Sequence, residues 1–387
     1  MILHVACLPF PSFQGTQAAL SAMLDASARA GRETHVLTYA HGAHPLHAAY
    51  RVHRLPDFPR VRSLRSGPTW GKLALDARCI AATRRLVDEL QPDAVVAHHV
   101  EAALATQFAG VAPVYYVAHT SLETELSVYF SRLPKWALRL GGRFVDRVAM
   151  GLAERTAAVA PALAARLGDG VVHLPVPWRT ERRRARKTAG AVMLYAGNLD
   201  SYQGWEDLLE ALRQLRALRP NARLLIASES DPSAARREAA RLGVGSAVDF
   251  SRLDGEAART RVHDASDLAW IPRRTEGGLP IKMLDAFARG LPVVASRRAT
   301  AGLPVERACR VVPSDDPAAF ARATHRLLDD EPARRVLVDA GLQYLAAHHS
   351  DTAYLAALDA LLGRSASPEE ATLSEPRRPA APVLRAR

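Results

Sequence analysis

The chain has 387 residues, of which 48% are hydrophobic and 24% charged, a composition that excludes a disordered or fibrous protein and suggests two domains. The formal net charge of +11 favours anionic partners such as nucleotides, phosphates, anionic lipid or nucleic acid, without choosing among them. Three widely spaced cysteines argue against a disulfide framework or a zinc site and fit a reducing cytoplasm.

The N-terminus, MILHVACLPF, lacks a basic leader and stays apolar only briefly, so it predicts a strand and not a signal peptide. No run of 18 apolar residues occurs, so we expect no membrane-spanning helix and a cytoplasmic protein.

Short apolar runs alternate with helical stretches in the first half of the chain, a pattern typical of βαβ units and a parallel sheet. One helix is expected at 17–30. Strands are expected at 2–8, 34–40, 93–98, 114–120 and 156–161.

A proline-punctuated and then basic stretch, HLPVPWRTERRRARKTAG (173–190), interrupts this pattern and predicts a hinge. The alternation then restarts, with strands expected at 191–197, 222–228, 246–251, 267–272, 292–296 and 309–313. Helices are expected at 205–219, 316–329, 332–348 and 353–362.

The sequence therefore predicts an α/β protein with two Rossmann-like domains whose parallel sheets face a cleft, where ligands bind beyond the carboxyl ends of the strands. We place the first domain at 1–175, the hinge at 176–190 and the second domain at 191–349. A C-terminal helix (350–363) and a disordered tail (364–387), rich in Pro, Ala, Ser and Arg, follow.

The loop PFPSFQGTQ (9–17) follows the first predicted strand. Gly15 allows backbone N–H groups to approach an anion, and Thr16 is suited to cap the following helix or to bind a ligand. A tight βα turn explains the same residues, and the loop is neither a GxGxxG fingerprint nor a P-loop.

The stretch YAGNLDSYQGWEDLL (195–209) ends another strand at the expected cleft. Gly197 permits a close approach, and the amides of Asn198 and Gln203 can donate to phosphate or sugar oxygens. Turn and capping chemistry would also explain most of these residues.

The strongest signal is IPRRTEGGLPIKMLDAFARG (271–290), where a glycine loop leads into a helix that begins near Pro280. Free N–H groups at such a helix start bind phosphate well. Candidate donor-binding residues in this stretch are Arg274, Glu276, Gly277, Gly278, Leu279, Pro280 and Asp285.

The charges in this stretch predict a divided site. Arg273, Arg274 and Lys282 suit a diphosphate, while Asp285, one turn after Lys282, suits the hydroxyls of an attached ribose. The alternative is an exposed Lys–Asp pair worth less than ~1 kcal/mol.

In the first domain, AHTSLETEL (118–126) follows a strand directly, so His119 should face the cleft. Glu123 and Glu125 are candidates for binding an acceptor hydroxyl, or alternatively first-turn residues that match the helix dipole. A lone histidine at a strand end can also be a packed residue.

The order of these motifs resembles retaining glycosyltransferases of the GT-B fold, family 4 (group 1), over essentially 2–362. The segment GGLPIKMLDAFARGLPVVAS (277–296) is similar to the family's nucleotide-binding segment, and Asp285 falls where the family's ribose-binding Glu stands. The resemblance also implies a position for His119 near the donor sugar and the acceptor.

The chain departs from the family pattern at three positions. Asn198 and Gln203 stand where the family commonly has an Arg and a Lys for the diphosphate, and Gly277 replaces the first Glu, with Glu276 adjacent. We expect the missing positive charge from nearby side chains: Arg273, Arg274 and Lys282.

Basic residues alternate with Trp and Leu in 131–152 and, more weakly, in 60–72, a composition that suits contact with anionic lipid. An amphipathic helix packed on the sheet would explain the first stretch equally well. The run RTERRRARK (179–187) is expected to be a solvated linker.

Together these features predict a retaining glycosyltransferase that uses a nucleotide-diphosphate sugar, needs no metal or other cofactor, and carries its chemistry on His119, Lys282 and Arg273. The acceptor would be a glycan or a lipid-linked glycan, in cell-envelope or exopolysaccharide synthesis, with the protein peripheral at the inner face of the membrane. The alternatives are a nucleotide-sugar epimerase of the same fold and a non-catalytic nucleotide-sugar-binding protein. Nucleic acid is not an expected partner, because stacking aromatic residues near the basic runs are missing.

Overall fold

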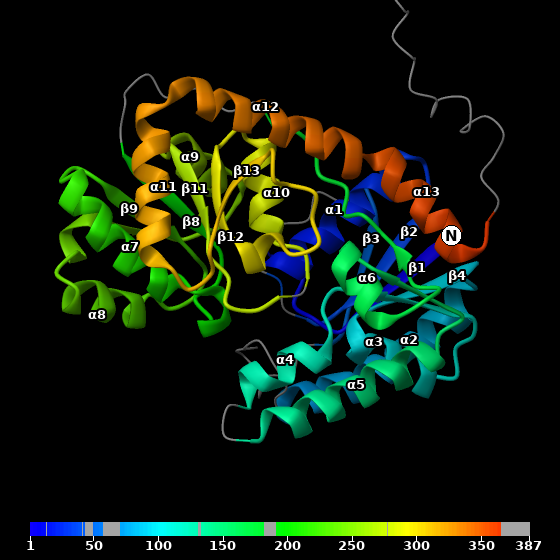
Figure 1. Cartoon of the computed structure of the whole chain (residues 1–387). Helices are drawn as coiled ribbons and strands as arrows, with labels where there is room; N and C mark the ends of the chain where they lie inside the picture. Colours follow the sequence, from blue (N-terminus) through cyan, green and yellow to red (C-terminus); the bar gives the residue numbers. More distant parts are fainter. Residues whose placement is uncertain are drawn as a thin grey trace, which may run out of the picture.

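The computed structural model describes residues 1–12, 14–40, 42, 49–56, 70–130, 133–181, 191–276 and 278–364. These residues form two α/β domains, each built on one parallel sheet, as the sequence predicts (Figure 1). The basic stretch 182–190, most of the stretch 60–72 and the tail from 365 lie outside the described residues.

The first domain contains a seven-stranded sheet of order β3-β2-β1-β4-β5-β6-β7. Its strands are β1 (Ile2–Ala6), β2 (Thr34–Thr38), β3 (Arg51–Arg54), β4 (Ala94–His98), β5 (Val114–Ala118), β6 (Arg155–Ala158) and β7 (Val172–His173). Its helices are α1 (Gly15–Arg29), α2 (Trp70–Leu90), α3 (His99–Phe108), α4 (Leu122–Tyr129), α5 (Lys135–Gly151) and α6 (Pro161–Leu167).

The second domain contains a six-stranded sheet of order β10-β9-β8-β11-β12-β13. Its strands are β8 (Val192–Ala196), β9 (Arg223–Ala227), β10 (Val248–Ser251), β11 (Leu268–Ile271), β12 (Val293–Ser296) and β13 (Cys309–Val312). Its α-helices are α7 (Trp205–Leu218), α8 (Ser233–Arg241), α9 (Glu256–Asp264), α10 (Ile281–Ala288), α11 (Pro317–Asp329) and α12 (Glu331–His348). Short 3₁₀ turns lie at η1 (Ser201–Gln203), η2 (Gly245–Ala247) and η3 (Arg297–Thr300).

The central strands are buried along their whole length because both faces of each sheet are covered. Every residue of β1, β2 and β4 is buried, and so is every residue of β11 and β12. Fully buried parallel strands appear in a sequence as largely continuous apolar runs, which is why these strands could be predicted from the sequence. The two strands that it did not predict, β3 and β7, are partly exposed edge strands, and β3 is mostly polar.

The strand order reverses between β1 and β4 in the first sheet and between β8 and β11 in the second. Loops after these strands leave the sheets at their carboxyl ends, where open parallel sheets bind ligands.

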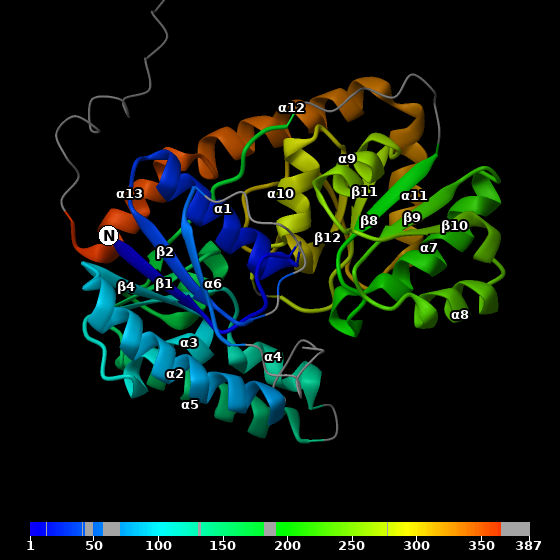
Figure 2. The same ribbon diagram turned by 180° about the vertical axis from the view of Figure 1, so that it is seen from behind.

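The C-terminal helices connect the domains. Helix α12 runs from the second domain toward α13 (Asp351–Leu362), which packs against the first domain (Figures 1 and 2). Two ion pairs fix α13 there: Arg29 with Asp351 at 2.9 Å and Arg32 with Asp359 at 2.6 Å. Across the described residues, no helix has both the length and the apolar character required to traverse a bilayer.

Candidate active site

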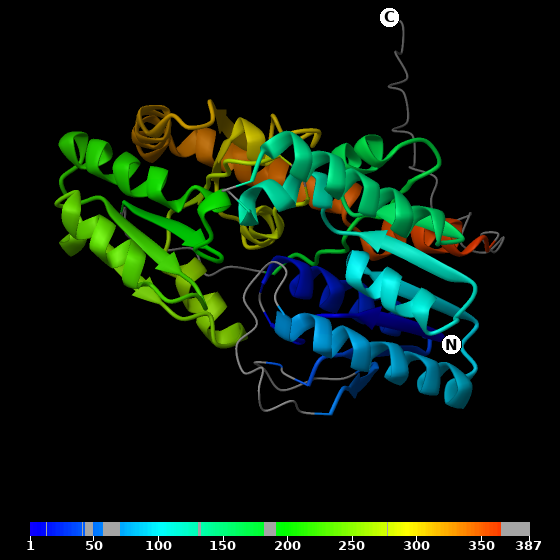
Figure 3. The same ribbon diagram turned by 90° about the horizontal axis from the view of Figure 1, so that it is seen from below.

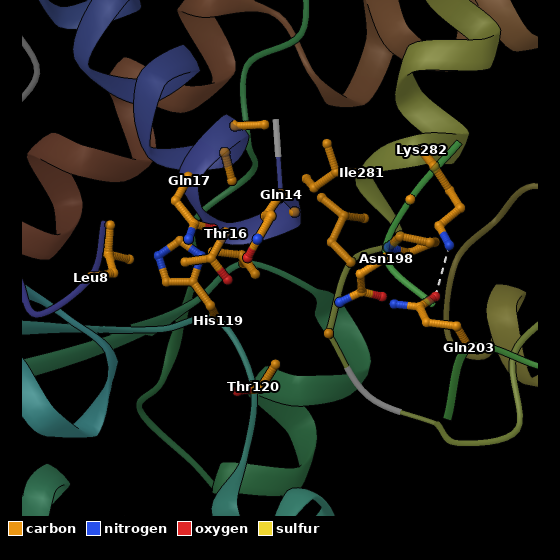
Figure 4. A pocket seen from close by; sticks show the side chains of 18 of the residues that line it. Leu8, Gln14, Thr16, Gln17, His119, Thr120, Asn198, Gln203, Ile281 and Lys282 are labelled. Carbon is orange, nitrogen blue, oxygen red and sulfur yellow. Dashed lines mark hydrogen bonds between the residues drawn. The ribbon is translucent and has the colours of Figure 1, made fainter. Parts of the chain in front are cut away.

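A cleft lies between the two domains. It is lined by the loops that follow the strands at which the strand order reverses, β1 and β4 in the first sheet and β8 and β11 in the second. Its lining residues fall mostly within 7–19, 99–101, 119–125, 196–203 and 271–285. Figure 4 shows Gln14, Thr16, Gln17 and His119 on one side, facing Asn198, Gln203 and Lys282 on the other. The candidate residues of both halves therefore meet in one cavity.

Gly15 and Thr16 line the cleft at the start of α1. A Cβ atom on Gly15 would lie 3.9 Å from Ile281 Cγ1, so the starts of α1 and α10 lie close together across the cleft. Both helix N-termini thus direct their positive dipole ends toward this space.

His119 faces the cleft at the end of β5 and is almost completely buried, with an exposed fraction of 4%. Its Nε2 lies 3.0 Å from Nδ1 of His98, and the ring of His99 stacks on it with the centroids 4.9 Å apart. Burial, assisted by the neighbouring His99, lowers the pKa of His119 well below its ordinary value. The ring is therefore neutral at pH 7.

The two candidate acceptor-binding glutamates lie in different surroundings in the structure. Glu125 lines the cleft, and burial raises the pKa of its carboxyl group to about 7. Glu123 does not line the cleft, and its carboxylate instead accepts hydrogen bonds from Arg143 on α5. Glu123 therefore joins α4 to α5.

In the second domain, the loop after β8 lies directly against Lys282. The ammonium group donates to Gln203 Oε1 at 2.7 Å and sits 4.3 Å from the centre of the Tyr195 ring. A Cβ atom on Gly197 would lie 2.9 Å from Lys282 Nζ, so a side chain at this position would displace the ammonium group from where it lies. Lys282 thus brings positive charge to the position that Asn198 and Gln203 leave neutral.

Burial and the neighbouring Arg273 lower the pKa of Lys282 to about 7. Arg273 lines the cleft as well, and its Nη1 donates to the carbonyl of Gly278 at 3.2 Å. Within the described residues, Arg273 Nε and Asn198 Oδ1 are buried polar atoms without a hydrogen-bond partner. Unpaired buried polar atoms are rare, so these two indicate polar groups of a ligand.

Arg274 and Glu276 do not line the cleft. Arg274 binds Asp207 at 2.8 Å and Glu206 at 3.3 Å, at the start of α7. Glu276 lies 3.9 Å from Arg166 on α6 of the first domain. As placed here, both side chains stabilise the walls of the site and do not reach into it.

Gly278, Leu279 and Pro280 line the cleft, whereas Gly277 lies outside the described residues. Gly278 has a φ of +67°, and a Cβ atom there would lie 3.0 Å from the carbonyl oxygen of His119. The glycine is required by both its backbone conformation and its contact with the first domain.

Asp285 also lines the cleft, but its carboxylate is already bonded within the protein. It accepts from Arg259 at 2.5 and 2.8 Å and from Arg289 at 3.2 Å, and it lies 3.2 Å from His263 Nε2. Burial alone would raise the pKa of Asp285, yet Arg259 and His263 hold it well below its usual range. Ribose binding by Asp285 stays a prediction.

Residues 190–330, most of the second domain, match the family model described as glycosyl transferases group 1. The second domain is therefore similar to the group 1 glycosyltransferases. A comparison with curated proteins found no match.

Solved glycosyltransferases share the fold of the whole chain. WaaG, a glycosyltransferase involved in lipopolysaccharide biosynthesis, is 17% identical, with a TM-score of 0.68 over 94% of this chain and 100% of WaaG. The sucrose-phosphate synthase of Thermosynechococcus elongatus is 19% identical, with a TM-score of 0.73 over 93% and 98% of the two chains. HepE of Anabaena, in complex with UDP-glucose, is 14% identical, with a TM-score of 0.70 over 94% and 100%. The fold of the chain is therefore GT-B, as predicted.

Several residues that line the cleft are not among the sequence predictions. Gln14 and Gln17 flank the predicted Gly15–Thr16 pair, and proximity in the loop could have identified them. Trp178 and Arg259 come from the hinge and from α9, and they meet with the guanidinium 5.3 Å from the Trp ring centre. No sequence pattern links those two positions.

Proposed function

We propose that the protein is a retaining glycosyltransferase that moves a sugar from a nucleotide-diphosphate sugar to a glycan or lipid-linked acceptor. The observation that carries the proposal is the convergence of Lys282 and Arg273 at the start of α10, inside the cleft. Two half-buried cations beside the first N–H groups of a helix form a site for a diphosphate. UDP-sugars are the first donors to test, because HepE, which has this fold, was crystallised with UDP-glucose.

In this proposal Lys282, Arg273 and the first amides of α10 stabilise the negative charge that develops on the departing diphosphate. These cations would act in place of a metal ion, so transfer should persist in the presence of a chelator. The acceptor binds on the first domain, where Glu125 accepts a hydrogen bond from its hydroxyl group. Transfer occurs on the face from which the diphosphate leaves, without a nucleophile from the protein.

The function is tested by incubating the full chain with radiolabelled UDP- and GDP-sugars, after a thermal-shift panel of nucleoside diphosphates has identified the preferred base. The expected result is transfer to a glycan or lipid, or slow hydrolysis to free sugar, with retention of the anomeric configuration read by NMR. Inversion of that configuration would contradict the retaining mechanism. Recovery of an epimerised donor would show an epimerase instead, and tight binding without turnover would show a binding protein.

We further propose that helix α5 docks on an anionic membrane and brings the enzyme to a lipid-linked acceptor. Trp136, Leu140 and Phe144, spaced four residues apart, are 72%, 61% and 67% exposed and lie on one face of the helix. Basic residues accompany them on α5: Lys135, Arg139, Arg143 and Arg147. An exposed apolar stripe beside basic side chains matches the surface of an anionic bilayer.

The position of α5 supports the same conclusion. A Cβ atom on Gly142 would lie 2.4 Å from the carbonyl oxygen of Leu122, so α5 packs closely against α4. Helix α4 carries Glu125 into the cleft, and α5 lies on its outer side, as seen from below in Figure 3. A membrane bound to α5 would therefore adjoin the acceptor side of the cleft.

Cosedimentation with vesicles containing phosphatidylglycerol tests this proposal. The wild type should bind, and Phe144→Ser should weaken binding by about tenfold, because one exposed phenyl ring is worth roughly 1.5–3 kcal/mol when buried. The matched control is Phe108→Ser, at an equally exposed phenylalanine on α3 (75%). Failure of the wild type to bind, or an equal loss in the control, would contradict membrane docking by α5.

A further inference from the structure

Three buried histidines form a continuous chain beneath the first-domain side of the cleft. Nδ1 of His4 lies 2.9 Å from Nε2 of His98, and Nδ1 of His98 lies 3.0 Å from Nε2 of His119. The chain crosses three neighbouring strands, because β1 pairs with β4 and β4 pairs with β5. Of the three rings, His119 lines the cleft (Figure 4), whereas His4 and His98 are not among its lining residues.

Each hydrogen bond between two ring nitrogens needs one N–H group and one lone pair. Burial lowers the pKa of His4 to about 3 and the pKa values of His98 and His119 well below the ordinary value. All three rings are therefore neutral at pH 7, and each carries one ring proton. The direction of one hydrogen bond then determines the direction of the other.

Only two arrangements of the three protons satisfy both hydrogen bonds. In one, every proton is on Nδ1, and His119 presents an Nδ1–H donor. In the other, every proton is on Nε2, and His119 presents a lone pair at Nδ1. Nδ1 of His119 has no hydrogen-bond partner in the described part of the chain, so it is the atom available to a ligand.

His4, the histidine at the end of the row opposite His119, decides between these arrangements. Nε2 of His4 is buried and has no hydrogen-bond partner among the described residues. A proton there would leave a buried N–H group unsatisfied, which is rarer and more costly than an unused acceptor. The proton of His4 therefore resides on Nδ1, and the protons of His98 and His119 follow it.

We propose that His4 and His98 are positioning residues that hold His119 in the Nδ1–H tautomer, so that it donates a hydrogen bond to an oxygen of the bound sugar. This inference rests on the proposed function for the identity of the ligand, but not for the tautomers themselves. His119 then acts as a hydrogen-bond donor and not as a base, because removal of its Nδ1 proton would require reversal of all three tautomers. The stacked ring of His99 fixes the plane of His119.

The tautomers can be read directly by NMR of the full chain labelled with ¹⁵N-histidine, without donor or acceptor. Protonated and unprotonated ring nitrogens differ strongly in ¹⁵N chemical shift, and single His→Gln variants assign the signals. We expect protonated Nδ1 and unprotonated Nε2 at His4, His98 and His119 throughout pH 6–8. A protonated Nε2 at His98 or His119, or a doubly protonated ring, would overturn the proposal.

Kinetics of His98 variants supply the second test. His98→Leu should lower kcat by about tenfold, the low end for losing a partner that orients a functional histidine. His98→Gln should stay within about threefold of the wild type, because an amide can accept from His4 and donate to His119. KM for the donor should change little in either variant.

The matched control is His35→Leu, which removes another buried histidine of the same sheet, 3.2 Å from His53 and outside the cleft. Its kcat should equal that of the wild type. Equal losses of kcat in His98→Leu, His98→Gln and His35→Leu would mean that the three linked histidines only pack the core, and would refute the proposal. An unchanged kcat in His98→Leu would refute it as well. If no sugar is transferred at all, the proposed function fails while the NMR spectrum still decides the tautomers.

Discussion

The two sides of the cleft differ in the charges of the side chains that line them. The second-domain side places Lys282 and Arg273 in the cavity, whereas the first-domain side has no Lys or Arg among its described lining residues and presents His119, Thr16 and Gln17 together with Glu101 and Glu125. The cationic side suits phosphate, and the polar and acidic first-domain side suits sugar hydroxyls. A protein that binds both ends of a nucleotide-diphosphate sugar needs this division.

A second contrast lies within the cationic side itself. Arg273 and Arg274 are adjacent and chemically identical, yet Arg273 enters the cleft while Arg274 is neutralised by Asp207 and Glu206. Charge near a site is therefore not the same as charge available to a ligand. Only cations without a carboxylate partner can offset the charge of a diphosphate.

The largest expected effect is that of Lys282→Ala. Removing the ammonium should lower kcat/KM for the donor by about 10³-fold, a loss comparable to that of a strong transition-state donor. The measurement is steady-state transfer from the preferred donor, with circular dichroism to verify the fold.

Arg274→Ala is the control for this variant, since it removes a nearby cation that does not reach the cleft. Its kcat/KM should stay within about fivefold of the wild type, because a half-exposed ion pair contributes under ~1 kcal/mol. Equal losses at the two positions would mean that the contrast between paired and unpaired cations does not govern donor binding.

The sequence located the fold well because buried parallel strands are continuous apolar runs and the loops after them contain glycines. It could not separate Arg273 from Arg274, because the loop conformation after β11 decides which of them faces the cleft. It could not pair Glu123 with Arg143 either, since that contact depends on how α5 packs on α4. The histidine chain was missed because the adjacency of β1, β4 and β5 follows from strand order and not from any local pattern.

Asp285→Asn tests the one carboxylate in the cleft that is fully engaged by cations. The substitution leaves the buried Arg289 and the partly buried Arg259 beside a neutral amide, so we expect the free energy of unfolding to fall by about 3 kcal/mol. Urea denaturation measures this loss. Asp207→Asn, in a more exposed pair with Arg274, should cost under ~1 kcal/mol and serves as the control.

The same variant decides whether Asp285 also binds ribose. If it does, 2′- and 3′-deoxy nucleoside diphosphates should bind the wild type about tenfold more weakly than the parent nucleotide, as expected for a lost hydrogen bond to a charged group. Asp285→Asn should no longer discriminate between them. Equal binding of deoxy and parent nucleotides to the wild type would make Asp285 a structural residue only.

The smallest expected effect is a pH dependence that arises from Lys282. Its pKa is lowered from 10.5 to about 7 in the ligand-free protein, and only the protonated form attracts a diphosphate. The pH profile of kcat/KM reports the free enzyme, so its value for the donor should fall about fivefold between pH 7 and pH 8. Lys282→Arg, charged at both values, should lose this decrease.

The free energy of unfolding should also depend on the protonation of Lys282, but it should rise with pH where kcat/KM falls. Between about pH 7 and pH 10 the unfolded chain holds a proton on Lys282 that the folded chain has released, so this group makes the ligand-free fold more stable as pH rises. The increase should be seen in urea denaturation as a difference between the wild type and Lys282→Met. If the donor affinity and the free energy of unfolding of the wild type both rose between about pH 7 and pH 10, Lys282 would not contact the diphosphate. Arg273 would then be the cation that binds it.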